Sequence, residues 1–175
     1  MKTMKCEDLF NEVKNWLETE RIDFSADSEN ATLEGWMTAA NGMVQVSLRC
    51  EESPVILQVV CGFPLRVPKE KIADTALFLH NLNASLRIGS FCLNPELRMI
   101  VFRLTVSVRP EADLRHQFCE AFATALGTCD DYLSPLALLL SSTTAAQKLV
   151  AKFAQEADVE TTTPRFPQSR RLELN

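Results

Sequence analysis

His116 and Cys119 come nearest to a catalytic pair in this chain. They lie three positions apart in a segment with helical periodicity, so both could face the same way. A cysteine beside a histidine can act as a nucleophile, and the two side chains could form half of a metal site. However, Cys119 adjoins an apolar stripe, and free cysteine is commonly a small buried residue. No further ligands follow at zinc spacing. We therefore expect a structural role and keep a thiol enzyme or redox sensor as the alternative.

For each of the other titratable residues that could be catalytic, a structural role is the simpler interpretation. His80 follows Leu79 in a segment of helical periodicity, and we expect a partly buried structural histidine rather than a general base. Asp130 and Asp131 are adjacent, so on a helix they diverge by ~100° and more readily solvate a helix end than act as paired carboxylates. The chain has no Gly-rich phosphate loop, Gly-x-Ser-x-Gly elbow or His-Glu-x-x-His motif. We expect a protein that is not an enzyme and binds no cofactor or metal.

Composition indicates an ordinary globular protein. The chain has 175 residues, of which 46% are hydrophobic and 23% charged, enough for one domain and a peripheral element. The net charge is −5 and no basic stripe remains, which argues against nucleic acid as a partner. The six cysteines are scattered and the first residues lack an apolar leader. The longest aliphatic run is five residues, too short for a membrane span. We expect a cytoplasmic protein with reduced thiols.

The first half of the chain predicts a helix followed by three strands. Residues 5–20 place apolar side chains on one helical stripe. Asn41-Gly42 suits a type I′ hairpin, because both residues tolerate positive φ, and it should join strands at 32–38 and 43–49. The more apolar residues 55–60 predict a central strand covered on both faces, which Phe63-Pro64 interrupts or ends because proline donates no ladder hydrogen bond.

The second half predicts a helix, two strands and a further helix. Pro68 opens the second helix, whose expected buried stripe includes Ala73, Ala76 and Leu77 and which should end near Asn83. Strands follow at 88–93 and 99–106. A third helix starts at Pro110, and Ser134-Pro135 begins a separate short apolar element.

This order, α-β-β-β-α-β-β-α, predicts an α+β fold with an antiparallel sheet and helices packed on one face, because its strands come in runs. We place this domain at residues 1–141, an additional amphipathic C-terminal helix at 142–157 and a disordered tail at 158–175.

One segment resembles a known family. Its pattern is similar to that of the YbjN-like family of bacterial sensory-transduction regulators. The pattern consists of Val67-Pro68, a helix ending at Asn83, the residues Gly89-Ser-Phe91-Cys-Leu93-Asn94 and a strand carrying Arg103. The fold of that family looks like that of class I type III secretion chaperones. The element order agrees over residues 5–133. Two departures are Asn94, where an Asp is more usual, and residues 95–98, which lack the glycine often seen there.

The resemblance implies a non-enzymatic, homodimeric module that binds a protein or peptide client. Secretion chaperones of this fold wrap an extended client segment around their surface. Some clients add a strand to the sheet edge and insert apolar side chains into grooves. Of the family-motif residues, Asn83 and Gly89 are expected to take left-handed backbone conformations, with a ligand contact as the alternative for Asn83. Phe91 and Arg103 are expected to be structural as well.

A second candidate surface is the aliphatic run at residues 136–140. Five aliphatic residues in succession cannot all be buried under one helix-on-sheet contact. We expect a partner-binding or dimer surface here, formed by Leu136, Leu138, Leu139 and Leu140. Two alternatives stay open, namely that the run packs on its own core or contacts the predicted helix at 143–157.

Overall fold

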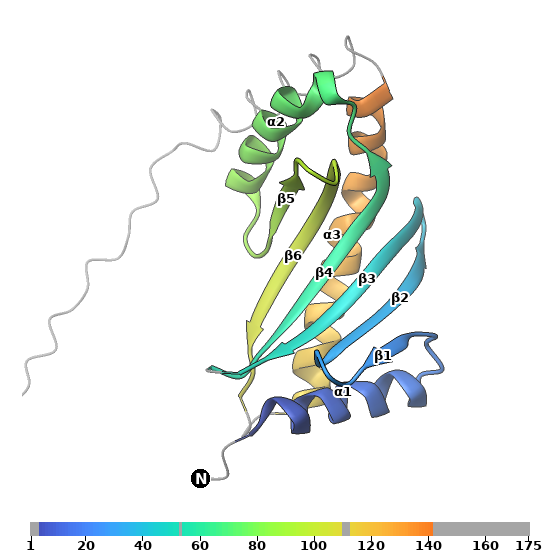
Figure 1. Cartoon of the computed structure of the whole chain (residues 1–175), viewed down its shortest axis with the longest axis vertical. Coiled ribbons are helices and arrows are strands. Elements are labelled where there is room, and N and C mark those ends of the chain that lie inside the picture. Colours follow the sequence, from blue (N-terminus) through green and yellow to red (C-terminus); the bar gives the residue numbers. More distant parts are fainter. Residues whose placement is uncertain (1–3, 53, 110–112, 142–175) are drawn as a thin grey trace, which may run out of the picture.

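The computed structural model describes residues 4–52, 54–109 and 113–141. These residues form a six-stranded antiparallel sheet with the strand order β1-β2-β3-β4-β6-β5, accompanied by three α-helices (Figure 1). The elements in chain order are α1 (Cys6–Thr19), β1 (Ser25–Asp27), β2 (Thr32–Ala39), β3 (Gly42–Glu51), β4 (Ile56–Arg66), the 3-10 helix η1 (Lys69–Lys71), α2 (Ile72–Ser85), β5 (Ser90–Asn94), β6 (Met99–Ser107) and α3 (Leu114–Ser141). The predicted α+β class and element order are confirmed, and β1 is an additional short strand.

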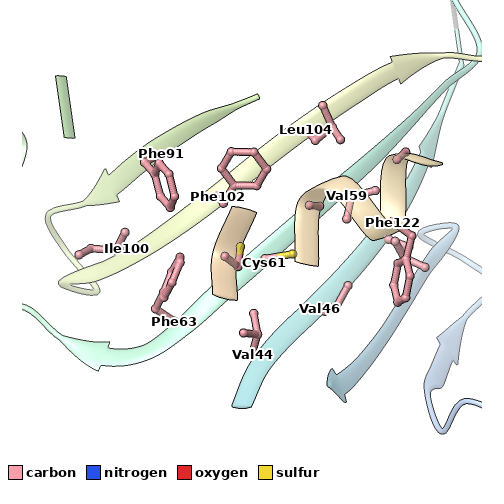
Figure 2. Packing of buried hydrophobic residues seen from close by; sticks show 14 of the residues in the cluster. Val44, Val46, Val59, Cys61, Phe63, Phe91, Ile100, Phe102, Leu104 and Phe122 are labelled. Atoms are coloured by element: carbon pink, nitrogen blue, oxygen red, sulfur yellow. The ribbon is translucent and has the colours of Figure 1, made fainter. Parts of the chain in front are cut away.

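The core lies between one face of the sheet and helices α1 and α3. Side chains alternate across each strand, so every second residue of the inner strands is buried. Figure 2 shows this packing, in which Phe122 of α3 joins residues from four strands: Val44, Val46, Val59, Cys61, Phe63, Phe91, Ile100, Phe102 and Leu104. On α1, Leu9, Phe10, Val13 and Leu17 are buried, as the helical stripe predicted. In Figure 1, α3 passes behind the strands.

The β2–β3 hairpin forms, but its turn differs from the predicted one. Ala39 pairs with Gly42, so the two loop residues are Ala40 and Asn41 rather than Asn41 and Gly42. Neither loop residue has positive φ, which excludes type I′. The reason is tertiary, because the Asn41 backbone N–H donates to Asp130 Oδ1 of α3 at 2.7 Å.

Strand β4 is central, and Phe63-Pro64 interrupts its pairing with β6 as predicted, but the prediction that the strand is covered on both faces was wrong. The strand continues to Arg66, and its register with β6 shifts between Gly62 and Arg66. Pro64 lacks the N–H that a regular ladder needs, and the irregularity absorbs this loss. Gln58 and Val60 face away from α3 and are only half-buried, which leaves the second face of the sheet uncovered by α1 and α3.

Helix α2 is oriented differently from the prediction. It buries Thr75, Phe78, Leu79 and Leu82, whereas Ala73, Ala76 and Leu77 are exposed. An apolar helix offers two possible buried faces, and the aromatic ring of Phe78 decided between them by entering the core. Figure 1 shows α2 beside β5 at one edge of the sheet.

Helix α3 is one continuous element of 28 residues, so the separate element predicted at Ser134-Pro135 was wrong. Pro135 lies inside the helix, where it removes one hydrogen bond. Burial of Leu133, Leu136 and Leu139 around it holds the helix together. The predicted start at Pro110, the helix at 143–157 and the tail at 158–175 lie outside the described residues.

Candidate partner-binding surface

The structure does not assemble His116 and Cys119 into a dyad. His116 Nε2 lies 3.3 Å from Glu120 Oε1, one helical turn onward, and both side chains are exposed. Cys119 is half-buried and packs against the core. Within the described ranges, no hydrogen bond joins the two residues and no group of metal-ligating side chains gathers. What the arrangement provides is a surface ion pair, charged only when His116 is protonated.

The other titratable candidates also have structural places. His80 is exposed on α2, which corrects the expectation of a partly buried histidine. Asp130 holds the hairpin tip, because Asn41 donates to it through its backbone N–H and donates to its carbonyl through Nδ2 at 3.3 Å. Asp131 is exposed. The two adjacent carboxylates therefore do not form a paired acid site, because Asp130 binds the hairpin tip and Asp131 faces solvent.

Four of the six free thiols lie close to another cysteine. Cys6 Sγ donates to the Cys50 carbonyl at 3.1 Å. Burial raises the pKa of Cys50 to about 12, and burial together with Glu52 and Glu51 raises the pKa of Cys6. A hydrogen bond with Cys61, and then burial, raise the pKa of Cys129. These environments favour the neutral thiol, which is the opposite of what a nucleophilic cysteine needs.

Asn83 closes the sheet edge at β5. Its Nδ2 donates to the Phe91 carbonyl at 2.9 Å, and its Oδ1 accepts the Phe91 N–H at 2.7 Å. The side chain thus occupies both outward-facing backbone groups of Phe91, as a neighbouring strand would. The predicted left-handed conformation was wrong, because α2 continues through Asn83 to Ser85.

The other residues of the motif position β5 and β6. Gly89 has φ +75°, as expected, and a Cβ there would overlap the ring of Phe102. Phe91 is buried between the rings of Phe63, Phe102 and Tyr132. Arg103 points to the exposed side of β6.

The two departures from the family pattern also have a geometric explanation. Asn94 Oδ1 accepts the backbone N–H groups of Glu96 and Leu97, at 3.0 and 2.9 Å, which an aspartate could do as well. Arg98 takes the left-handed conformation, with φ +54°, in the turn that lacks a glycine.

The opposite sheet edge is open along the second half of β2. Strand β1 pairs with β2 only from Thr32 to Glu34. The Cys50 N–H donates to the Ala31 carbonyl at 3.0 Å, and hydrogen-bonding direction alternates along a strand. The even-numbered residues Trp36 and Thr38 therefore direct their backbone groups outward. In the part of the chain that the structure describes, no strand pairs with that edge.

Trp36 and Met43 form an apolar patch beside this edge, on the face of the sheet that α1 and α3 leave uncovered. Their side chains are 53% and 50% exposed. Trp36 pairs with Gln45 and Met43 with Thr38, which makes Trp36 and Met43 diagonal neighbours within reach of each other. Our sequence reasoning missed this patch. The available signal was the alternation along β2, which puts Trp36 on the same face as Glu34 and Thr38.

A cleft of about 220 Å³ lies between α1 and the start of α3. Its walls include Leu9, Trp16, Leu114 and Phe118. The Trp16 indole Nε1 is buried without a hydrogen-bond partner among the described residues.

The aliphatic run divides between the core and the surface. Leu136 and Leu139 are 0% and 1% exposed, so they belong to the protein's own core. Leu138 is 49% exposed and Leu140 is half-buried. Of the four leucines, only Leu138 and Leu140 are therefore accessible enough to form a partner surface.

No helix within the described residues is long and apolar enough to cross a membrane.

Comparison with known proteins agrees with this fold. The model of the family YbjN, described as "putative bacterial sensory transduction regulator", matches residues 10–137. The crystal structure of YbjN from E. coli aligns with a TM-score of 0.54 at 14% identity, covering 73% of this chain and 91% of the other. A chain of the HopA1–SchA chaperone–effector complex aligns with a TM-score of 0.51 at 15% identity, covering 75% and 98%. No curated protein sequence matches.

Proposed function

Because the chain belongs to the YbjN family, we propose that it is a non-enzymatic module that binds an extended segment of a partner protein. The open outer edge of β2, next to exposed Trp36 and Met43, carries this proposal. The same fold in a chaperone–effector complex supports a protein client.

The client would add a strand to β2. The outward N–H and C=O groups of Trp36 and Thr38 would pair with its backbone, which gives affinity without sequence selectivity. An apolar client side chain on the uncovered face would contact Trp36 and Met43, and this contact would provide selectivity. The β5 edge suits a client poorly, because Asn83 already occupies Phe91 there.

The cleft between α1 and α3 suits a second part of the client. An apolar client side chain would contact Leu9 and Phe118, which line this cleft, and its burial there would be favourable.

The proposal extends to a homodimer in the bacterial cytoplasm. Exposed Leu138 and half-buried Leu140, on the last turns of α3, would form the contact between copies. The β2 edge lies on a different part of the molecule from these turns (Figure 1), so dimerisation and client binding would not compete.

The test separates the backbone edge from the side chains around it. Thr38→Pro removes the outward N–H without breaking the β2–β3 ladder, since proline is tolerated on edge strands. Thr38→Val keeps the N–H and serves as the control. Immobilised wild type and both variants are incubated with a bacterial lysate, and captured proteins are compared by mass spectrometry. We expect partners that the wild type and Thr38→Val capture and that Thr38→Pro loses at least tenfold.

Equal capture by Thr38→Pro, with circular dichroism showing an intact fold, would contradict binding at this edge. Capture of nothing by all three proteins would contradict the protein-binding function itself.

A further inference from the structure

Helix α2 presents an apolar face to solvent. Ala73, Ala76, Leu77, His80 and Ala84 recur at helical spacing and all are exposed. The Leu77 side chain is 54% exposed, and this face carries no lysine or arginine. Its one neighbouring carboxylate is that of exposed Asp74, at the margin of the face and one turn before Leu77. An exposed apolar stripe of this kind commonly marks a contact surface. The outward face of α2 therefore lacks a cover among the described residues.

The chain leaves α3 close to the beginning of α2. Lys71 Nζ, directly before α2, donates to the carbonyls of Leu139 and Leu140 at 3.1 and 2.8 Å. These carbonyls belong to the last turn of α3, and a lysine there also suits the negative end of the helix dipole. Whatever follows Ser141 thus starts beside the first turn of α2.

The sequence that follows has the pattern and length of a cover. Within residues 143–157, apolar positions recur at helical spacing: Ala146, Leu149, Val150, Phe153 and Ala157. At about 1.5 Å per residue, a helix of this segment would be about 22 Å long and would match the 14 residues of α2. Alanines on α2 would allow a close approach, since interaxial distance depends on the side chains at the contact.

We propose that residues 143–157 form a helix that packs its apolar stripe on the outward face of α2 in the same chain. Only Ser142 separates this segment from α3, so its effective concentration at α2 is high. A second copy on the same face would have to offset the loss of translational and rotational freedom, whereas the tethered segment does not.

This contact has a consequence for binding. With α2 covered, partners and second copies reach the β2 edge, the uncovered sheet face and Leu138, but not α2. The inference does not depend on the proposed function, because it concerns a different surface.

Hydrogen exchange of the full chain, followed by mass spectrometry, tests the contact. In the wild type we expect amides of 146–157 to exchange at least about tenfold more slowly than an unstructured peptide, equally at two protein concentrations a hundredfold apart. Leu77→Asp should abolish this protection. Met43→Asp introduces the same charge at a residue of similar exposure on the sheet, and it should leave the protection unchanged.

A reciprocal pair of variants guards against an indirect effect of Leu77→Asp. Phe153→Asp should abolish the protection, whereas Gln155→Asp on the opposite side of the segment should keep it. Unprotected amides in the wild type would overturn the proposal, and so would protection that survives Leu77→Asp. Protection that appears only at the higher concentration would also overturn it and would identify a second copy as the cover.

Discussion

Asn83 shows how a residue that suggests ligand chemistry can act as a part of the backbone ladder. Its amide offers one donor and one acceptor to Phe91, which replaces a missing strand at the β5 edge. Gly89, His116 and Asp130 likewise have packing or hydrogen-bonding roles in this structure. At the scale of single residues, these side chains therefore support the backbone and the packing of the described part of the chain.

Replacing Asn83 should destabilise the fold. In Asn83→Ala, both half-buried backbone groups of Phe91 lose their partners, at a cost of about 1–3 kcal/mol in the free energy of unfolding. Urea denaturation measures this change. Asn81→Ala is the control, because Asn81 lies on the same helix and makes no side-chain hydrogen bond within the described residues. Equal losses of unfolding free energy in both variants would argue against a stabilising role of the hydrogen bonds between Asn83 and Phe91.

Gly89 should not tolerate a side chain. Alanine at φ +75° is strained, and its Cβ would push the fully buried ring of Phe102. The two effects together predict a loss of about 2–4 kcal/mol. Gly127→Ala on α3, where a Cβ meets nothing within 4 Å, should instead gain up to about 1 kcal/mol. Chemical denaturation of both variants checks the contrast, and a neutral Gly89→Ala would refute it.

Thiol labelling tests the alternative of a reactive cysteine. With iodoacetamide at pH 8, we expect Cys119 to react no faster than Cys92, which is half-buried as well. Cys50 should stay unmodified until the protein unfolds, because burial raises its pKa to about 12 and leaves about one thiolate in ten thousand at pH 8. Much faster labelling of Cys119, slowed by His116→Ala, would restore the thiol hypothesis.

At the scale of elements, α3 organises the domain. It contacts β2, β3, β4 and β6, and its Arg115 forms an ion pair of 2.6 Å with Glu20, the residue that directly follows α1. Its Asp130 fixes the β2–β3 hairpin and its last turn accepts Lys71. The open β2 edge keeps its place because both ends of the strand are tied down, one by β1 and the other by α3.

Removing the carboxylate of Asp130 should loosen the hairpin tip. Asp130→Ala leaves the Asn41 N–H to water, and we expect a loss of about 1 kcal/mol because the bond is exposed. Hydrogen exchange around residues 38–43 should quicken in this variant. Asp131→Ala, the exposed neighbour, is expected to change neither quantity, and a similar effect of both would point to net charge instead of the specific bond.

At the scale of the whole molecule, the sheet has one covered face and one face that α1 and α3 leave open. The open face brings together residues of every strand from β2 to β6, and its exposed apolar side chains are Trp36 and Met43. Asn83 occupies the outward backbone groups of Phe91 at the β5 edge, whereas no strand among the described residues pairs with Trp36 and Thr38 at the β2 edge. The proposed client strand would therefore approach from the β2 side.

The proposed homodimer should depend on one exposed residue, Leu138. Light scattering should give twice the chain mass of 19.6 kDa for the wild type. Leu138→Asp should give the mass of one chain, because it places a charge in the proposed contact. Leu97→Asp, at another exposed leucine, should remain dimeric. A monomeric wild type, or a dimer that persists in Leu138→Asp, would contradict the proposed surface.

The sequence by itself determined the class of the fold and the order of its elements apart from the short strand β1. Period-two alternation in β3 and the helical stripe of α1 indicate these elements, since a slip in either would expose the core. The family followed from the resemblance of residues 67–103. The left-handed Gly89 was also predictable. These features depend on the types and spacing of residues close together in the chain, and that information is present in the sequence.

Only the tertiary structure decided which face of α2 is buried, that Pro135 lies inside a helix and that Asn83 reaches across to Phe91. It also decided which sheet edge stays open, and so where a partner would bind. Each of these outcomes depends on contacts between residues distant in the chain, or on a choice between two locally equivalent arrangements. Local propensity cannot rank such alternatives, because the free energy that separates them comes from packing.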